Sequence, residues 1–154
     1  MPLSTGRLNC PPEVSGEAYG RITAELVRQD PAKATAALST MEAGFERTEM
    51  LETLVDQWAY QDPQSAADWT LSNTSGVDQL RAVTSLMDAW MTTDPMSAST
   101  WIANIDNGAI KDSAILALTQ SRAVARDPEA AAAWTAAIQD QQLRESIQAQ
   151  LATP

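Results

Sequence analysis

The stretch DPMSASTWIANIDNG, residues 94–108, decides the fold because its punctuation recurs along the chain. Its opening Asp-Pro pair occurs again at Asp30-Pro31, Asp62-Pro63 and Asp127-Pro128, at spacings of 32, 32 and 33 residues. Self-similarity at a fixed period of roughly 20–50 residues is typical of stacked supersecondary units. The sequence therefore predicts a repeat protein.

Several other positions repeat in step with the Asp-Pro pair. An alanine follows four residues after each Asp, as Ala34, Ala66, Ala98 and Ala131. Tryptophan recurs on both sides of the pair, as Trp58 and Trp90 before it and Trp69, Trp101 and Trp134 after it. Glycine follows in three of the four copies, as Gly44, Gly76 and Gly108. The period therefore involves core and turn positions together.

Each repeated residue type has a structural meaning. Asp is a strong N-cap residue and Pro suits the first helical position, so Asp-Pro predicts a helix start at Asp30, Asp62, Asp94 and Asp127. Glycine is common just after a helix, so we expect Gly44, Gly76 and Gly108 to end these helices. Apolar residues spaced three and four apart fill the segment before each Asp, which predicts a second helix in every unit.

The expected fold class is therefore all-α, a right-handed αα-hairpin repeat solenoid. Its four repeats cover about 14–44, 45–76, 77–108 and 109–141, and a capping helix covers 142–152, within a single domain of residues 14–154. The alternative is that 142–152 begins a further unit of a longer array. Residues 1–13 are expected to form a flexible arm. We expect the extra residue before Asp127 in the turn between units or in the first turn of the following helix.

Apolar stripes at the helical period carry the predicted core. They comprise Ala18, Tyr19, Ile22, Leu26 and Val27 in the first unit, Met50, Leu51, Leu54, Val55 and Trp58 in the second, Ala82, Val83, Leu86, Met87 and Trp90 in the third, and Ile115, Leu116, Thr119, Ala123 and Val124 in the fourth. All five tryptophans fall on such stripes, and the two sets should face each other across each helix pair. The competing interpretation is that exposed tryptophan binds sugars.

Composition argues against most chemistry. The chain has no histidine and one cysteine, and it lacks a phosphate-binding glycine motif, so we predict no catalytic, cofactor or metal site and a protein that is not an enzyme. A net charge of -10 disfavours nucleic acid and anionic membranes. The chain has no apolar run long enough for membrane insertion. We expect a cytoplasmic protein, or a periplasmic or secreted one if a signal peptide has been removed.

One face of the first helix in each central unit is a candidate binding surface for a protein or peptide, and its charge would suit a basic partner. Positions on the side away from the apolar stripe give Glu49, Glu52, Asp56 and Tyr60 in the second unit and Arg81, Thr84, Asp88 and Thr92 in the third. These residues would make the middle of the array acidic. The alternative is that they are ordinary solubilising charges on a helix surface.

The helix-pair period with Ala and Trp at fixed positions resembles tetratricopeptide-like and HEAT-like α-solenoids over residues 17–152. The resemblance implies a non-catalytic scaffold that binds a protein or peptide on its concave face. The chain departs from the tetratricopeptide consensus in its period and in the placement of Gly and Pro, so no ligand-binding residue carries over. The alternative function is a helical accessory or catalytic domain of a sugar or cell-envelope enzyme with a Trp and carboxylate cleft. The oligomeric state stays open.

Overall fold

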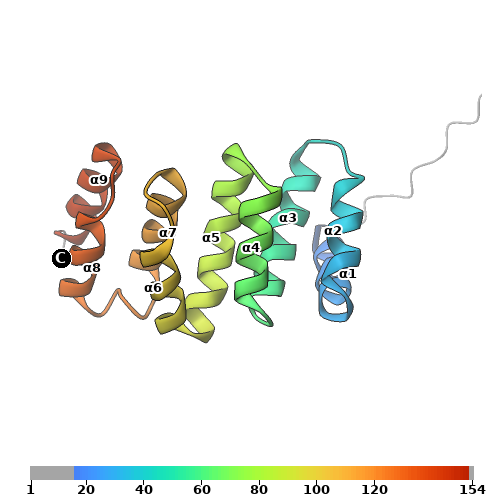
Figure 1. Cartoon of the computed structure of the whole chain (residues 1–154), viewed down its shortest axis with the longest axis horizontal. Coiled ribbons are helices and arrows are strands. Elements are labelled where there is room, and N and C mark those ends of the chain that lie inside the picture. The colour runs from blue at the N-terminus through green and yellow to red at the C-terminus, as the bar shows by residue number, and fades with distance from the viewer. Residues whose placement is uncertain (1–15, 153–154) are drawn as a thin grey trace, which may run out of the picture.

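The computed structural model describes residues 16–152, and within them the chain is all-helical, as predicted. Its nine helices follow one another from one end of the molecule to the other (Figure 1). They are α1 (Gly16–Gln29), α2 (Pro31–Ser39), α3 (Phe45–Ala59), α4 (Pro63–Asn73), α5 (Gly76–Thr93), α6 (Pro95–Asn104), α7 (Ala109–Gln120), α8 (Pro128–Ala136) and α9 (Gln141–Leu151). The expected arm at 1–13 lies outside the described residues.

Each Asp-Pro pair stands at the start of a helix, where the carboxylate accepts a hydrogen bond from a backbone amide of the first turn. Asp62 accepts from the amide of Ser65 at 3.1 Å, and Asp94 accepts from that of Ser97 at 3.1 Å. The other two caps join Asp30 to the amide of Ala32 and Asp127 to that of Ala130, both at 3.0 Å. Proline is the first residue of α2, α4, α6 and α8.

The turn before each cap is short in three of the four helix pairs. Only Asp30 separates α1 from α2, only Asp94 separates α5 from α6, and three residues separate α3 from α4. The short turns bring tryptophans of the two helices together. The ring centroids of Trp58 and Trp69 lie 6.1 Å apart, and those of Trp90 and Trp101 lie 5.6 Å apart.

The glycines do not end helices, contrary to the prediction. Gly44 and Gly108 are the N-cap residues of α3 and α7, and Gly76 is the first residue of α5. The preceding helices end earlier: α2 at Ser39, α4 at Asn73 and α6 at Asn104. Gly76 has φ +60, in the left-handed region that glycine adopts most easily. The glycines therefore stand at the start of the following helix, and at Gly76 the backbone φ angle favours glycine.

The extra residue of the fourth unit is in a different turn from the predicted one. Helix α7 stops at Gln120, and residues 121–127 connect it to α8, whereas α5 continues to Thr93 with one residue before α6. The connection contains a single turn closed by the amide of Ala125 bonding to the carbonyl of Ser121 at 2.9 Å. Val124 is buried there, but Ala123, expected in the core, is exposed. The insertion therefore shortens a helix.

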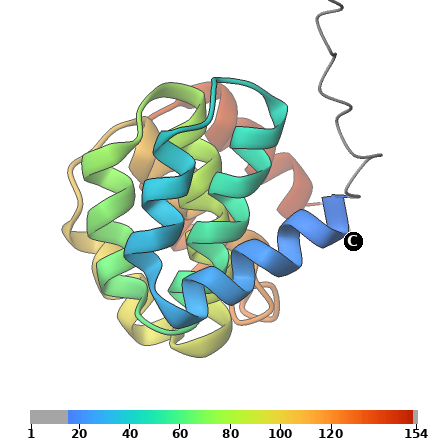
Figure 2. The same ribbon diagram turned by 90° about the vertical axis from the view of Figure 1, so that its right-hand side faces the viewer.

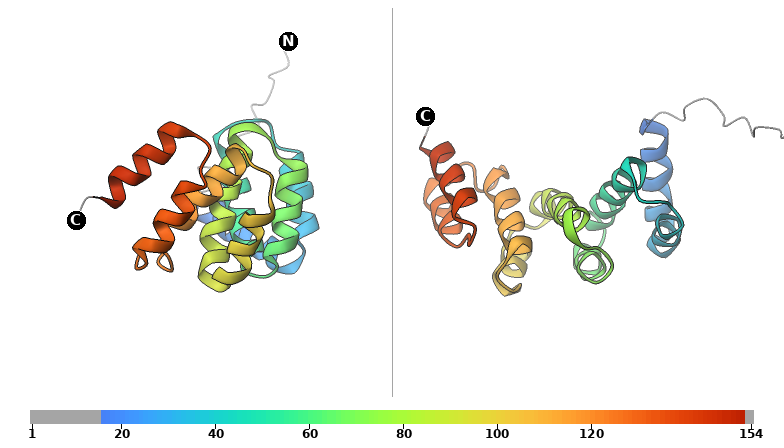
Figure 3. Two further views of the ribbon diagram at one scale, coloured as in Figure 1. Left: turned by 60° about the vertical axis from the view of Figure 1, so that its left-hand side comes forward. Right: turned by 90° about the horizontal axis from the view of Figure 1, so that it is seen from above.

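Four helices, α1, α3, α5 and α7, form the packed layer of the molecule. Helices α1, α3, α5 and α7 contact one another in sequence, while α2, α4 and α6 contact their odd-numbered neighbours and have at most minor contacts with one another. The view from above shows the same succession (Figure 3). The core follows this layer, with Leu51, Leu54, Leu86, Met87 and Ile115 fully buried.

Ile22, like Ala123, is a predicted core residue that the structure exposes. The side chain of Ile22 on α1 is 56% exposed. Its counterparts at the 32-residue period, Leu54, Leu86 and Leu118, have no exposed surface. Thr23 is buried instead, because α2 and α3 are the described helices that α1 contacts and both lie on that side. Tyr19, also predicted in this stripe, has a side chain outside the described part of the structure.

Two carboxylates join the start of one helix to an earlier helix. Asp78, at the start of α5, accepts from Arg47 at 3.2 Å and from the Thr48 hydroxyl at 3.3 Å, both on α3. Asp112 on α7 is buried and accepts from the amides of Gln139 and Asp140 at 2.9 Å each, just before α9. Helix α9 otherwise packs mainly on α8. Among residues 16–152, no helix has the length and apolar character needed to cross a membrane.

Candidate interaction surface

The eight predicted partner-binding residues form two adjacent rows on α3 and α5, which pack directly on each other. Within each row the residues are three or four apart, so each row follows one face of its helix. Most are exposed, and two are half-buried. The exposed ones are Glu49, Tyr60, Arg81, Thr84, Asp88 and Thr92, and the half-buried ones are Glu52 and Asp56.

The two rows are linked by one ion pair. The Arg81 guanidinium on α5 donates to the Glu52 carboxylate on α3 at 3.3 Å. This contact neutralises one of the carboxylates that sequence reasoning assigned to the acidic face. More than a third of each side chain is exposed to solvent, which screens the charges. The ion pair therefore contributes little to stability.

Asp56 and Asp88, like Glu49, are carboxylates of this surface that form no ion pair with a cation of the described residues. Partial burial raises the pKa of Asp56, against the smaller opposing effect of the hydrogen bond donated by Gln57. Asp88 is exposed, but partial desolvation by the neighbouring protein atoms raises its pKa, and the negative charge of Asp56 raises it further. The surface therefore holds two carboxylates that repel each other.

A recess between α1 and α3 extends this acidic surface. It has a volume of about 180 Å³, and its lining includes Glu46, Glu49 and Glu52 together with Thr23 and Met50. Sequence reasoning missed Glu46 and the contribution of α1. The spacing of three residues between Glu46, Glu49 and Glu52 is the signal that could have indicated Glu46, since such residues share a helix face.

The opposite end of the same two helices carries basic residues. A recess of about 510 Å³ is lined there by Arg21, Arg28 and Tyr60, with Glu25 beside them. Arg28 is already paired with Glu25 within α1. The surface over α1 and α3 is thus acidic at one end and mixed in charge at the other.

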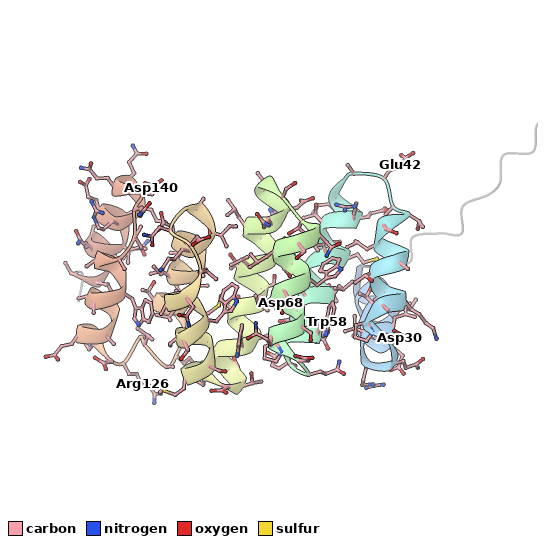
Figure 4. All side chains as sticks on the ribbon, viewed as in Figure 1. Asp30, Glu42, Trp58, Asp68, Arg126 and Asp140 are labelled. Carbon is pink, nitrogen blue, oxygen red and sulfur yellow. The ribbon has the colours of Figure 1, made fainter. Side chains whose placement is uncertain are left out.

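The tryptophans lie apart from the acidic surface. Trp90 and Trp101 are buried, and Trp58, Trp69 and Trp134 are partly buried. Figure 4 labels Trp58 on α3 and Asp68 on α4, both within the α3–α4 pair. Trp69 lines a recess of about 320 Å³ between α2 and α4, together with Arg47 and without a carboxylate.

Metal ligands do not gather in the described part of the chain, where no three His, Cys, Asp or Glu side chains are placed to hold an ion. No protein-family model, curated protein or solved structure matches this sequence or fold. The functional argument therefore depends on the surface itself.

Proposed function

We propose that the protein is a non-catalytic scaffold, a right-handed α-solenoid of helix pairs that binds a protein or peptide over the acidic face of α3 and α5. The observation that carries the proposal is the pair of adjacent carboxylates, Asp56 and Asp88, which lack a cation and whose partial desolvation raises their pKa. The repeated layer of α1, α3, α5 and α7 supports the solenoid interpretation.

A basic segment is the partner that fits this surface. A lysine or arginine placed beside Asp56 and Asp88 would replace their mutual repulsion with two attractions in a partly desolvated environment. The recess lined by Glu46, Glu49 and Glu52 offers a second place where a positively charged side chain of the partner could bind, on the same side of α3. Helical or extended peptides recognised along such a surface present side chains at regular spacing. The proposed partner is therefore a peptide with two or more cations on one side.

The test is binding of immobilised 15-residue peptides of graded Lys and Arg content, compared between the parent chain and variants. We expect Asp56→Lys/Asp88→Lys to weaken binding of the basic peptides by tenfold or more, and added salt to weaken binding by the parent. The matched control is Asp68→Lys/Asp106→Lys, which reverses the same number of exposed charges elsewhere. Equal loss in both double variants, or no binding by the parent, would contradict the proposal.

The alternative, a helical domain of a sugar or cell-envelope enzyme, has weaker support. It requires a tryptophan beside carboxylates in a cleft, whereas the Trp58–Trp69 and Trp90–Trp101 pairs pack within their own helix pairs. Titration of tryptophan fluorescence with oligosaccharides tests it directly. A saturable spectral change with any of them would favour the enzyme-associated role.

A further inference from the structure

The outer side of α1 is an apolar surface, and the equivalent position is covered in each of the other three helix pairs. Ile22 is 56% exposed, and its counterparts Leu54, Leu86 and Leu118 are fully buried. Helix α1 has the neighbours that α3 has on its following side, namely the partner helix of its own pair and the next odd-numbered helix. The difference between the two environments is therefore the preceding unit. Figure 2, which faces this end, shows α1 in the foreground with no described helix over its outer side.

The outer side of α1 has a regular composition along its length. Ala18, Ile22 and Leu26 form a row spaced by four residues, and Arg21 and Glu25 form a second row beside it. All five residues line one open recess of about 530 Å³. Ile22 is exposed, whereas Ala18 and Leu26 are half-buried and Leu26 also packs against the core, so the exposed apolar surface centres on Ile22, with Arg21 and Glu25 beside it.

We propose that a second copy of this chain covers the outer side of α1, and that the two α1 helices pack antiparallel about a two-fold axis near Ile22. A two-fold contact uses the same surface on both copies, so each group on it must meet its own complement. In the antiparallel arrangement Ile22 packs against the partner copy's apolar row, and Ala18 of one copy lies toward Leu26 of the other. Small and large residues then alternate across the contact.

The charges on the outer side of α1 favour a second copy of the chain as its occupant. With the crossing near Ile22, Arg21 of each copy lies toward Glu25 of the other, which gives two equivalent ion pairs. Glu25 already accepts from Arg28 and Gln29 within α1, at 2.6 Å from Gln29, so its carboxylate is held on this side of the helix. The chain as a whole has a net charge of -10, but this side of α1 carries Arg21 and Arg28 against Glu25. It is thus a place where two copies can approach without strong repulsion.

The size of the surface indicates a weak dimer. A helix of 14 residues is about 21 Å long, so one face of it buries well under the roughly 800 Å² per partner of a standard interface. We therefore expect a dissociation constant on the order of tens of micromolar. The surface lies apart from Asp56 and Asp88, so dimerisation and peptide binding succeed or fail independently.

The test is sedimentation velocity of the 154-residue chain from low micromolar to millimolar concentration. We expect a monomer–dimer equilibrium, and we expect Ile22→Asp to raise the dissociation constant at least tenfold with unchanged helical circular dichroism. The control Met96→Asp alters another exposed apolar residue, 79% exposed on α6, and leaves the dimer intact. Because Ile22 is exposed in the monomer, its replacement costs the fold little.

A charge exchange tests the arrangement of the two copies. Arg21→Glu and Glu25→Arg should each weaken the dimer severalfold, and the double variant Arg21→Glu/Glu25→Arg should restore it to within about threefold of the parent. A double variant no better than the singles contradicts the antiparallel pairing. A chain that is monomeric at every concentration overturns the proposal.

Discussion

At the scale of single residues, the capping aspartates act through charge as well as geometry. Asp62 accepts from both the amide and the hydroxyl of Ser65, the latter at 2.6 Å. These two hydrogen bonds lower the pKa of Asp62, the hydroxyl bond having the larger effect. The ionised cap is therefore the form that begins α4.

Replacing Asp62 with Ala should lower the free energy of unfolding by about 1 kcal/mol at neutral pH, because the first turn of α4 loses its cap. Chemical denaturation measures the change. The folded-state pKa is lowered below the ordinary value of 3.8, so this contribution is fully present above pH 3.8 and is lost as the pH falls through the folded pKa. Asp68→Ala in the same helix is the control, since Asp68 is exposed and accepts only from Gln64. Equal losses in the two variants would refute the capping role.

Asp88 should have the opposite pH dependence. Its folded-state pKa is raised, so the ionised carboxylate destabilises the folded protein at neutral pH, and that destabilisation disappears as the pH falls through the folded pKa toward 3.8. We expect Asp88→Asn to raise the melting temperature at pH 7 and to have little effect at pH 3. A lower melting temperature at pH 7 would mean that neither the loss of solvation nor the charge of Asp56 makes the ionised Asp88 unfavourable in the folded protein.

At the scale of the helix, the two ends of an element depend on different residues. The Asp-Pro pair begins the second helix of each pair by hydrogen bonding, whereas Gly76 begins α5 through a backbone angle. Neither Gly76 nor Gly20, within α1, has a neighbouring atom within 4 Å of the position a Cβ would occupy. The effect of adding a Cβ atom at Gly76 or Gly20 therefore depends on the backbone conformation there and not on steric clashes.

Alanine should have opposite effects at the two positions. Gly76→Ala places an L-residue at φ +60 and should cost about 1–2 kcal/mol. Gly20→Ala lies within a helix and should stabilise by about 0.5–1 kcal/mol. Thermal unfolding of both variants measures the pair, and shifts of the same sign would show that the backbone angle at Gly76 is relaxed at no cost.

Trp101 holds α6 to α5 through its contact with Trp90. It is 8% exposed, so Trp101→Ala should cost about 3–5 kcal/mol by leaving a cavity between the two helices. Met96→Ala in the same helix changes a residue that is 79% exposed and should cost under about 0.5 kcal/mol. Urea denaturation distinguishes the two, and a mild Trp101 variant would show that this tryptophan is not a packing residue.

Helix starts and buried stripes could be predicted from the sequence because they depend on local chemistry, as at Asp94 and Leu86. The exposure of Ile22 could not, because the residue type is the same whether or not another unit covers it. The glycines were placed on the wrong helix, since glycine suits both ends of a turn. In the candidate site, Asp56 and Asp88 could be placed on one face by spacing, but the Arg81–Glu52 contact depends on how α3 and α5 pack.

At the scale of the whole molecule, the structure depends on contacts between neighbouring helices, and among the described helices the first and the last have neighbours on one side only. The two long edges differ in their turns: Asp30 and Arg126 lie on one, and Glu42 and Asp140 lie on the other (Figure 4). Helices α8 and α9 pack on each other, and the Asp112 carboxylate holds the turn between them to α7. This end should therefore open separately from α3 and α5.

Asp112→Ala should expose that end of the molecule selectively. The variant leaves the amides of Gln139 and Asp140 without their acceptor, which costs about 1–3 kcal/mol for each amide that stays buried. Hydrogen exchange should then accelerate in residues 138–151 and stay slow in α3 and α5. The control Asp106→Ala changes an exposed turn residue and should leave the pattern unaltered. Uniform acceleration throughout would show that the chain unfolds as one unit.

The lack of substantial contact among α2, α4 and α6 has a mechanical consequence. Flexing that spreads these three helices breaks little packing between them, whereas the layer of α1, α3, α5 and α7 resists being pulled apart. The molecule should therefore resist stretching along its length and bend easily in the direction that separates α2, α4 and α6. The proposed partner, bound on α3 and α5, could therefore change the curvature of the molecule to fit its own shape at a small cost in elastic energy.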